Sequence, residues 1–376
     1  MPRKTSPRTH LVTGATGLVG GALILELLDN TPDQVVALVR PGKTEDAHTR
    51  LLSSLREAVA VYGRDPATIA FDRVRGVAGD LTQPACGVDL SGGLRADMMW
   101  HSAASLRYED RYQDQIMETN VTGTRNAIEL ARQAGVRVFN SISTAYVSGR
   151  REGQLLEIPR DDSAVQNHYE RSKVAAEAML QACDAFEVRV FRPSIVVGHS
   201  QTLAVTTFSG LYSFTRKMMQ YRGVLERVQK GLSSRRRIRI RADAHTPLDL
   251  IPVDSVAAQA VHIGTSDSAS GIYHLTQHAP PTVGDSLTAI ATELGFQEPE
   301  YVSGDTELEW LDQQFDKGLD FYSSYIRSER VFDRSRTDRA LGSRTDLRRR
   351  LPPVRNLVSW YARNLEQQRR GIPVAR

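Results

Sequence analysis

The chain has 376 residues, of which 40% are hydrophobic and 24% are charged, and its formal net charge is +4. These values suit a globular enzyme in one large domain or two unequal ones, and the mild positive charge does not by itself argue for nucleic acid. Two cysteines, Cys86 and Cys183, supply neither a disulfide framework nor a metal site, and they suit a reducing cytoplasm, where we expect the protein. No stretch is long and apolar enough to span a bilayer.

The first predicted elements are a short apolar strand at residues 10–13, an amphipathic helix, and a second buried strand at residues 34–40. Between the first strand and the helix stand Gly14, Gly17 and Gly20. They allow a tight turn and a close approach to a pyrophosphate, which the free N–H groups of the helix N-terminus attract. Because the glycines break the apolar run, it is not typical of a signal peptide. We expect the dinucleotide to contact Thr13, Gly14, Thr16, Gly17, Leu18 and Val19.

The second predicted strand ends at Arg40, where an NAD-dependent enzyme usually carries Asp or Glu for the ribose hydroxyls. A guanidinium suits a 2′-phosphate instead, because it can donate two parallel hydrogen bonds. We therefore expect NADP(H) as the cofactor. The alternative is an arginine that merely ends a strand.

Further strands alternate with helices along the chain, at residues 74–84, 96–105, 136–144 and 186–198. This alternation predicts an α/β fold with a doubly wound parallel sheet of the Rossmann type. Ligands of such sheets bind beyond the carboxyl ends of the strands. We expect further cofactor contacts from residues near these ends, namely Asp80 and Leu81 beside the adenine, Ala103 and Ala104, and Pro193, Ser194 and Ile195.

Tyr169 and Lys173 lie in the stretch NHYERSKVAAE, which covers residues 167–177. Their spacing places the phenol and the ammonium on one face of a predicted helix. A helix with a mixed surface face would show the same spacing, so the pair needs support from the rest of the chain.

Motifs spread over about residues 9–278 resemble the extended short-chain dehydrogenase/reductases. They are, in order, TGATGLVG, GDL, HSAAS, NVTGT, SISTAY, YERSK and RPSIVVG. Within this superfamily, HSAASLRYED, STAYVSG, DLIPVDSVAAQAV and the later FYSSYIRSERVFDRSRTDRALG are most similar to the thioester-reductase and fatty acyl reductase branch. Leu18-Val19 departs from the Phe-Leu of many members, but the exchange keeps both residues apolar.

The resemblance implies a catalytic set of Thr144, Tyr169 and Lys173, with Ser143 as the second candidate for the role of Thr144. The Tyr169 phenol would exchange a proton with a carbonyl oxygen to which Thr144 also donates a hydrogen bond. Lys173 would bind the nicotinamide ribose beside Tyr169. Together with the charge of the nicotinamide, it would lower the pKa of the tyrosine from its usual value of about 10. Asn120 would support the site by hydrogen bonding, or would only occupy a helix.

We divide the chain into a nucleotide-binding part and a smaller, mainly helical C-terminal lid that binds the substrate. The nucleotide-binding part comprises residues 1–198 and 248–278, and the lid comprises residues 199–247 and 279–376.

Three arginines of the lid, Arg237, Arg239 and Arg241, alternate with isoleucines and would share one face of a strand. Phosphates of coenzyme A or of a carrier-bound pantetheine, or an acidic helix of a carrier protein, would suit this arginine row. The alternative is a solvated edge strand that uses charge against aggregation.

The resembling branch reduces acyl groups that are held as thioesters on coenzyme A or on a carrier protein. The resemblance therefore implies NADPH-dependent reduction of such a thioester to an aldehyde, with the alcohol as the product of a second reduction. A free ketone, aldehyde or alcohol of the steroid, sugar-nucleotide or flavonoid type is the alternative substrate. A third alternative is an NADP-binding protein without activity, which the intact Thr-Tyr-Lys set disfavours.

Overall fold

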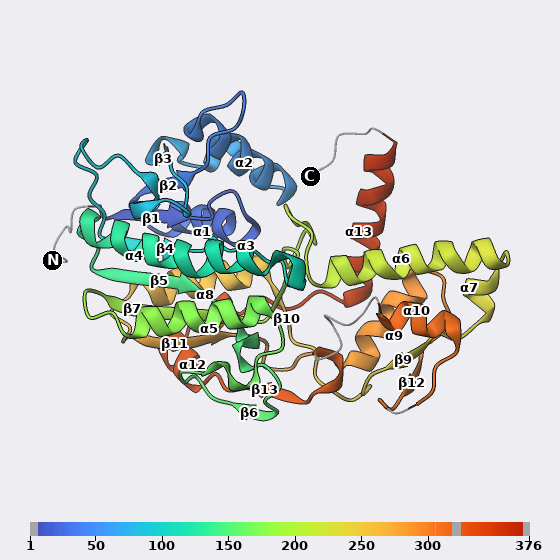
Figure 1. Ribbon diagram of the computed structural model, residues 1–376. Helices are drawn as coiled ribbons and strands as arrows, with labels where there is room; N and C mark the ends of the chain where they lie inside the picture. Colours follow the sequence, from blue (N-terminus) through green and yellow to red (C-terminus); the bar gives the residue numbers. More distant parts are fainter. Residues whose placement is uncertain (1–6, 305, 318–324, 371–376) are drawn as a thin grey trace.

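A seven-stranded sheet forms the centre of the computed structural model, which describes residues 7–304, 306–317 and 325–370 (Figure 1). Its strands follow the order β11-β7-β5-β4-β1-β2-β3, and every neighbouring pair is parallel. The strands are β1 (Thr9–Thr13), β2 (Gln34–Val39), β3 (Val74–Ala78), β4 (Met98–His101), β5 (Val138–Ile142), β7 (Glu187–Pro193) and β11 (Gly271–Leu275). The predicted α/β fold with a parallel sheet is confirmed.

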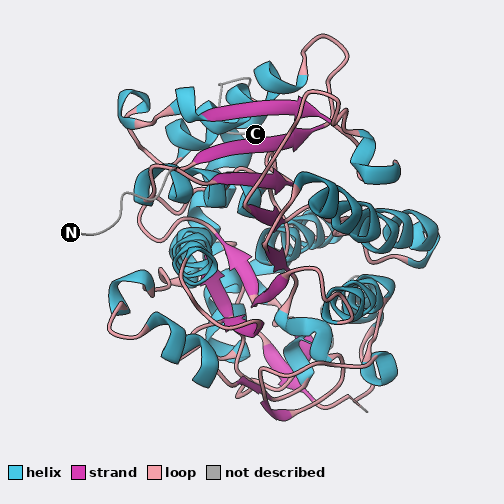
Figure 2. Cartoon of the chain, turned by 90° about the vertical axis from the view of Figure 1, so that its left-hand side faces the viewer, coloured by secondary structure: helices cyan, strands magenta, loops and turns pink. Residues whose placement is uncertain are grey.

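Helices cover both faces of this sheet (Figure 2). The bounds are α1 (Leu18–Asn30), α2 (Ala47–Val61) and α8 (Val253–Thr265) on one face, and α3 (Gln113–Met117), α4 (Gly123–Ala134) and α5 (His168–Gln181) on the other. Successive strand residues point to opposite faces, so both must be apolar. In β1, Val12 packs into the core that contains α1 and α8, while Leu11 packs into the core that contains α4.

The lid has a hydrophobic core of its own, beside the nucleotide-binding part (Figure 1). Its helices are α6 (Leu211–Val228), α7 (Leu232–Arg235), α9 (Val283–Glu293), α10 (Trp310–Lys317) and α13 (Val354–Arg369). A parallel pair of short strands, β9 (Arg239–Arg241) and β12 (Glu300–Val302), completes it. A second short parallel pair, β8 (Ile195–Val197) and β10 (Leu250–Pro252), lies where the chain leaves and re-enters the nucleotide-binding part.

One segment that we assigned to the lid packs against the nucleotide-binding part. Strand β13 (Arg330–Phe332) pairs with β6 (Gly153–Leu155), and α12 (Ser335–Leu341) follows it. Leu341 and Leu347 belong to the same hydrophobic core as α1 and α8. Our division of the chain remains a prediction, and this segment lies outside the core of the lid. Within the described ranges, no helix combines the length and the apolar character that crossing a bilayer requires.

Candidate active site

Four strand ends meet along the carboxyl edge of the sheet, because β7, β5, β4 and β1 are consecutive neighbours. Thr13 ends β1 and Pro193 ends β7, while Ala103 and Thr144 follow β4 and β5 by two residues each. The sheet order therefore brings these four predicted residues to one edge, the place where doubly wound sheets bind their ligands.

The glycine loop lies at this edge, tight against the backbone that follows β4. Gly14 has a φ of +72°, and a Cβ there would lie 2.6 Å from the amide nitrogen of Ala103. A Cβ on Gly20 would lie 2.1 Å from the carbonyl oxygen of Gly14. Both positions therefore require glycine. Gly17 is the N-cap of α1 and provides no side chain for its amides, so the N-terminus of this 13-residue helix fits a bound pyrophosphate.

The other predicted loop contacts lie in the same turn. Thr16 is half-buried, Gly17 is exposed, and Leu18 and Val19 are half-buried in the first turn of α1. Ala104 is half-buried directly after Ala103. The loop thus presents backbone and small side chains, and its contacts with a dinucleotide stay a prediction.

A buried chain of hydrogen bonds holds the loop ends in place through His101, which the sequence analysis did not single out. His101 Nδ1 lies 2.9 Å from Thr13 Oγ1, and His101 Nε2 lies 3.1 Å from Thr124 Oγ1. Thr13 Oγ1 accepts from the amide of Ala103, and Thr124 Oγ1 donates to the carbonyl of Asn120. Because Thr124 Oγ1 donates to Asn120, it accepts from His101, which places a proton on Nε2. Burial lowers the pKa of His101 to about 3, which keeps the ring neutral.

Tyr169 and Lys173 lie one turn apart on α5, which begins at an Asn167 side chain that accepts from the amide of Glu170. Lys173 is buried, and its Nζ donates a 3.0 Å hydrogen bond to the carbonyl of Ile142, the last residue of β5. The ammonium therefore lies at the carboxyl edge of the sheet, beside Ile142, which precedes Thr144 by two residues. Burial lowers the pKa of Lys173 to about 8, and the charge of Glu177 opposes this change.

In the protein alone the pKa of Tyr169 is not lowered, and the predicted lowering, which includes the charge of a bound nicotinamide, stays a prediction. Burial, and after it the negative charge of Glu170, raise the pKa of the phenol well above its usual value. Glu170 is the charged neighbour that contributes to this rise, while the Lys173 ammonium donates to the carbonyl of Ile142. Tyr169 is therefore a neutral phenol near neutral pH, which is the form that can donate a proton.

Thr144 and Ser143 have different surroundings. Among the residues that the structure describes, Thr144 Oγ1 accepts a 3.3 Å hydrogen bond from the amide of Tyr146 and donates none, so its hydroxyl proton is available for another acceptor. Ser143 Oγ instead donates to the buried carboxylate of Glu177. Ser143 therefore has a partner inside the fold, and Thr144 remains the better candidate to bind a substrate oxygen.

Asn120 lies in a π-helical turn (Glu118–Thr122), a geometry that is frequent at functional sites. Its side chain accepts from the amide of Ser105 and donates to the Ser105 carbonyl and to Ser172 Oγ, at 2.7, 3.1 and 2.8 Å. Ser172 directly precedes Lys173. The hydrogen bonds of Asn120 thus join the loop after β4 to α5, and they reach neither Tyr169 nor Lys173 directly.

Arg40 is exposed directly after β2, the neighbour of β1 on the far side from β4. Arg50 of α2, which the sequence analysis did not single out, reaches the same place, because its Nη1 donates a 2.6 Å hydrogen bond to the Arg40 carbonyl. Two guanidinium groups thus lie at the end of β2. Asp80 follows β3 and accepts from the amide and the hydroxyl of Thr82, while the Leu81 carbonyl accepts from Asn126.

Ser194 and Ile195 are bound mainly to a buried aspartate. Ser194 Oγ donates a 2.6 Å hydrogen bond to the carboxylate of Asp249, and the amide of Ile195 donates to the Asp249 carbonyl. The amide of Gln277 also donates to this carboxylate. Burial raises the pKa of Asp249 to about 6. Ser194 and Ile195 therefore offer a nucleotide little beyond their backbone carbonyls and the side chain of Ile195.

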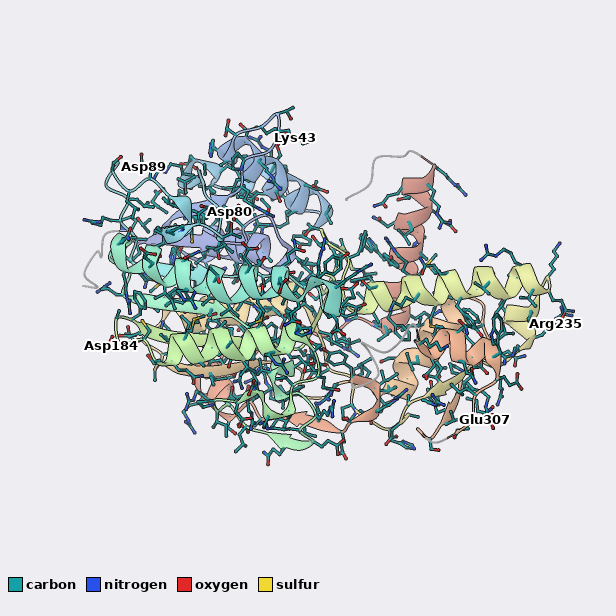
Figure 3. The ribbon with its side chains drawn as sticks, in the orientation of Figure 1. Lys43, Asp80, Asp89, Asp184, Arg235 and Glu307 are labelled. Atoms are coloured by element: carbon teal, nitrogen blue, oxygen red, sulfur yellow. The ribbon has the colours of Figure 1, made fainter. Side chains whose placement is uncertain are left out.

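The arginine row binds acidic groups and carbonyls of its own chain. Arg239 lies 3.5 Å from Glu300, and Arg241 forms a 2.8 Å ion pair with Asp316. Arg237 is exposed and precedes β9, so it does not belong to the strand. This end of the lid, where Arg235 and Glu307 are labelled in Figure 3, is remote from Asp80 of the nucleotide-binding part. These pairs favour a structural role for Arg239 and Arg241.

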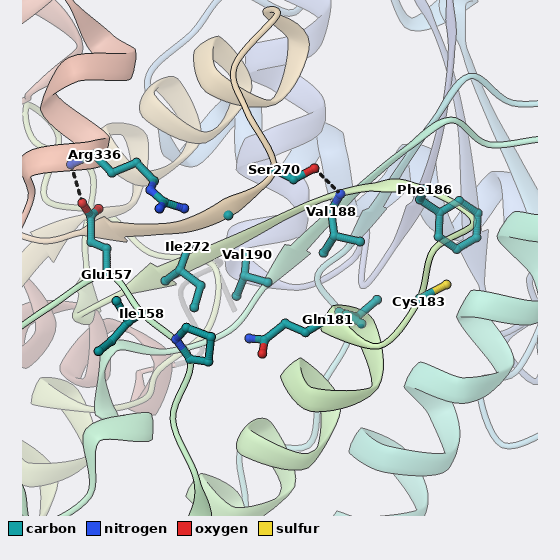
Figure 4. A pocket seen from close by; sticks show the side chains of 13 residues that line it. Glu157, Ile158, Gln181, Cys183, Phe186, Val188, Val190, Ser270, Ile272 and Arg336 are labelled. Carbon is teal, nitrogen blue, oxygen red and sulfur yellow. Dashed lines mark hydrogen bonds between the residues drawn. The ribbon is translucent and has the colours of Figure 1, made fainter.

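A cavity of about 320 Å³ lies at the opposite edge of the sheet from β3, between α5 and β11 (Figure 4). Its floor is apolar, with Val188, Val190 and Ile272 on the strands, while Glu157 and Arg336 lie at its rim. None of the predicted site residues lines this cavity. The candidate active site is therefore the carboxyl edge with its glycine loop, and not this cavity.

The fold and this site define an extended short-chain dehydrogenase/reductase that binds a nicotinamide cofactor. Residues 12–260 match the family described as male sterility protein, an NAD-binding family, and the chain belongs to it. The chain is 27% identical over 340 residues to the isonitrile lipopeptide synthase of Mycobacterium tuberculosis, a match that covers 83% of this chain. It spans only 13% of that synthase.

Two solved structures share the fold over nearly the whole chain. The terminal R domain from the myxalamid PKS-NRPS biosynthetic pathway has a TM-score of 0.75 at 24% identity, covering 100% of this chain and 94% of the other. A thiolation-reductase di-domain from an archaeal non-ribosomal peptide synthetase has a TM-score of 0.70 at 18% identity, covering 98% and 92%. The resemblance to the thioester-reductase branch is confirmed.

Proposed function

We propose that the protein is an NADPH-dependent reductase of an acyl thioester. The proposal is supported by the carboxyl edge of the sheet, where the glycine loop, Thr144 and the Lys173 ammonium lie, with Tyr169 one turn before Lys173 on α5. The similarity to a lipopeptide synthase and to a thiolation-reductase di-domain supports a thioester on a carrier protein, with coenzyme A as the second source.

The preference for NADPH rests on the end of β2. Arg40 stands where an acidic residue would contact the ribose hydroxyls of NAD, and Arg50 brings a second guanidinium to the same place. Two such groups attract the doubly charged 2′-phosphate and offer it paired donors. The loop of Gly14 and the open N-terminus of α1 would hold the pyrophosphate.

Three side chains have separate roles in the proposed reaction. When bound, NADPH supplies the hydride. Thr144 donates a hydrogen bond to the thioester carbonyl oxygen, and Tyr169, a neutral phenol, donates its proton to that oxygen as negative charge develops there. The resulting hemithioacetal separates into aldehyde and thiol. Lys173 holds the ribose next to Tyr169. The same residues serve a second reduction to the alcohol if the aldehyde stays in the site.

The direct test is oxidation of NADPH with a panel of acyl-coenzyme A and acyl-carrier thioesters, with identification of the aldehyde or alcohol. We expect turnover with NADPH and much weaker turnover with NADH. Arg40→Ala should weaken NADPH binding by about 10- to 100-fold, the effect of losing a charged hydrogen bond worth about 1.5–3 kcal/mol, and should barely change NADH binding. Efficient reduction of ketones, with no reduction of any thioester, would replace this proposal by a dehydrogenase of free alcohols or ketones.

A further inference from the structure

Glu177 lies on α5 one turn beyond Lys173, so Tyr169, Lys173 and Glu177 follow one another along one face of the helix. Its carboxylate is buried, with 4% of the side chain exposed. Neither the catalytic set nor the cofactor contacts include it. Burying a carboxylate costs free energy unless charged or polar groups compensate for the lost water.

The carboxylate of Glu177 is fixed on both oxygens. Arg192 of β7 donates to Oε1 through Nε at 3.0 Å and to Oε2 through Nη2 at 2.6 Å. Ser143 Oγ donates to Oε1 at 2.5 Å. The Arg192 side chain is only 1% exposed and also donates to the carbonyl of Ile158. This bidentate pair leaves the carboxylate little freedom to rotate away from α5.

Among the described residues, few charged groups surround Lys173 and Glu177. His101 faces Lys173 from β4, but it is neutral. Arg192 faces Glu177 from β7, and Arg160 faces it from the segment between β6 and α5. Glu177 is the charged group that opposes the loss of the Lys173 charge on burial. The ammonium needs such a group, because its own hydrogen bond goes to the neutral carbonyl of Ile142.

We propose that Glu177 is a positioning residue that acts through Lys173: held rigid by Arg192 and Ser143, its carboxylate keeps the buried ammonium charged for binding the nicotinamide ribose. The inference rests on the cofactor role that the proposed function gives to Lys173. The site then depends on an acid that touches neither substrate nor cofactor.

The test is the affinity for NADPH as a function of pH, measured by the fluorescence of the bound dihydronicotinamide. In the wild-type protein, affinity should fall as pH rises through the ionisation of Lys173, near pH 8. Glu177→Gln should move the midpoint of this fall to lower pH by about one unit, because the opposing charge is gone. An unchanged midpoint would overturn the inference.

Two further variants separate charge from folding. Glu177→Gln leaves the buried Arg192 charge uncompensated and can prevent folding, so Glu177→Gln is also combined with Arg192→Met, which removes both charges. The double variant should also show a lowered midpoint, and a wild-type midpoint would refute the inference. Asp312→Asn breaks a comparable buried pair with Arg236 in the lid and should leave the midpoint unchanged. An equal shift in this variant would show a general effect and overturn the role of Glu177.

The binding assay needs no thioester, so its result does not depend on whether the protein reduces one. If the wild-type protein shows the fall and the Glu177 variants share its midpoint, the inference about Glu177 alone fails. If the wild-type protein shows no fall, the assigned cofactor role of Lys173 fails and the inference fails with it. Turnover of thioesters is decided separately by the substrate panel.

Discussion

Replacing Gly14 by alanine should damage both stability and cofactor binding, and Gly93 offers a matched control. Gly14 has a φ of +72° and Gly93 a φ of +71°, so an alanine at either position pays the same cost for a left-handed backbone, about 1–2 kcal/mol. The surroundings differ. A Cβ on Gly14 would lie 2.6 Å from the Ala103 amide nitrogen, whereas nothing lies within 4 Å of a Cβ on Gly93.

The difference between the two variants measures the close approach of the glycine loop to the segment after β4. Overpacking of this kind costs about 1–3 kcal/mol, so Gly14→Ala should lose about 2–5 kcal/mol in total and Gly93→Ala about 1–2 kcal/mol. Urea unfolding measures both losses. Because the loop must move to relieve the contact, Gly14→Ala should also weaken NADPH binding by at least about tenfold, equivalent to 1.4 kcal/mol.

Equal losses of unfolding free energy in the two variants would refute this reasoning, since the contact with Ala103 would then carry no cost. Wild-type NADPH affinity in a folded Gly14→Ala variant would separately refute the placement of the pyrophosphate at this loop. Gly93→Ala should bind NADPH as the wild-type protein does.

Three further predictions concern the site, the lid and a buried acid. Tyr169→Phe should lower kcat by about 100-fold or more while leaving NADPH affinity close to that of the wild-type protein, and near-normal turnover would assign the proton to another group. Arg241→Ser should cost up to about 1 kcal/mol in urea unfolding by breaking the ion pair with Asp316, without raising KM for a carrier-bound thioester, whereas Arg237→Ser should change neither quantity. A raised KM with unchanged stability would instead give the arginine row a role in carrier binding. Burial raises the pKa of Asp249 to about 6, so between about pH 4 and pH 6 the folded protein retains a proton that the unfolded chain has released. The free energy of unfolding should therefore fall by about 3 kcal/mol as pH rises through this window. Asp249→Asn should remove that part of the pH dependence of urea unfolding, and an unchanged slope would show that Asp249 titrates normally.

The parts of the fold that the sequence predicts well are those with local patterns. Apolar runs that alternate with amphipathic helices predict a parallel sheet, and a parallel sheet gathers its strand ends at one edge. The placement of Thr13, Ala103 and Thr144 follows from these two steps alone. The spacing of Tyr169 and Lys173 likewise follows from the pitch of one helix.

The supporting contacts of the site depend on pairs that are distant along the chain. His101 reaches Thr13 across 88 positions, and Glu177 meets Arg192 only because α5 packs on β7. Neither contact has a local signature. The pairing of Gly153–Leu155 with Arg330–Phe332 joins two strands of three residues each, which are too short to show an alternating pattern.

The partners of charged side chains and the direction of their pKa shifts also could not be predicted from the sequence. The alternation around Arg239 and Arg241 suggests a free basic face, but Glu300 and Asp316 come from other segments of the lid. For Tyr169, a neighbouring lysine suggests a lowered pKa, whereas burial and Glu170 raise it. Burial is a property of the assembled fold, and it outweighs the charge of a neighbour in the same helix.

Part of the lid is inserted between the last two strands of the sheet, since α6 and β9 lie between β7 and β11 along the chain. During synthesis, β7 therefore emerges well before β11, its partner at the sheet edge, and before α8, which packs on α1. Until then the edge of the sheet at β7 lacks β11, and α1 lacks the packing of α8. Bringing β11 to β7 also closes the long loop between them, which carries an entropic cost. The nucleotide-binding part thus completes its fold only after the chain of α6 and β9 has been made, so neither part can be separated by a single cut near Gly198.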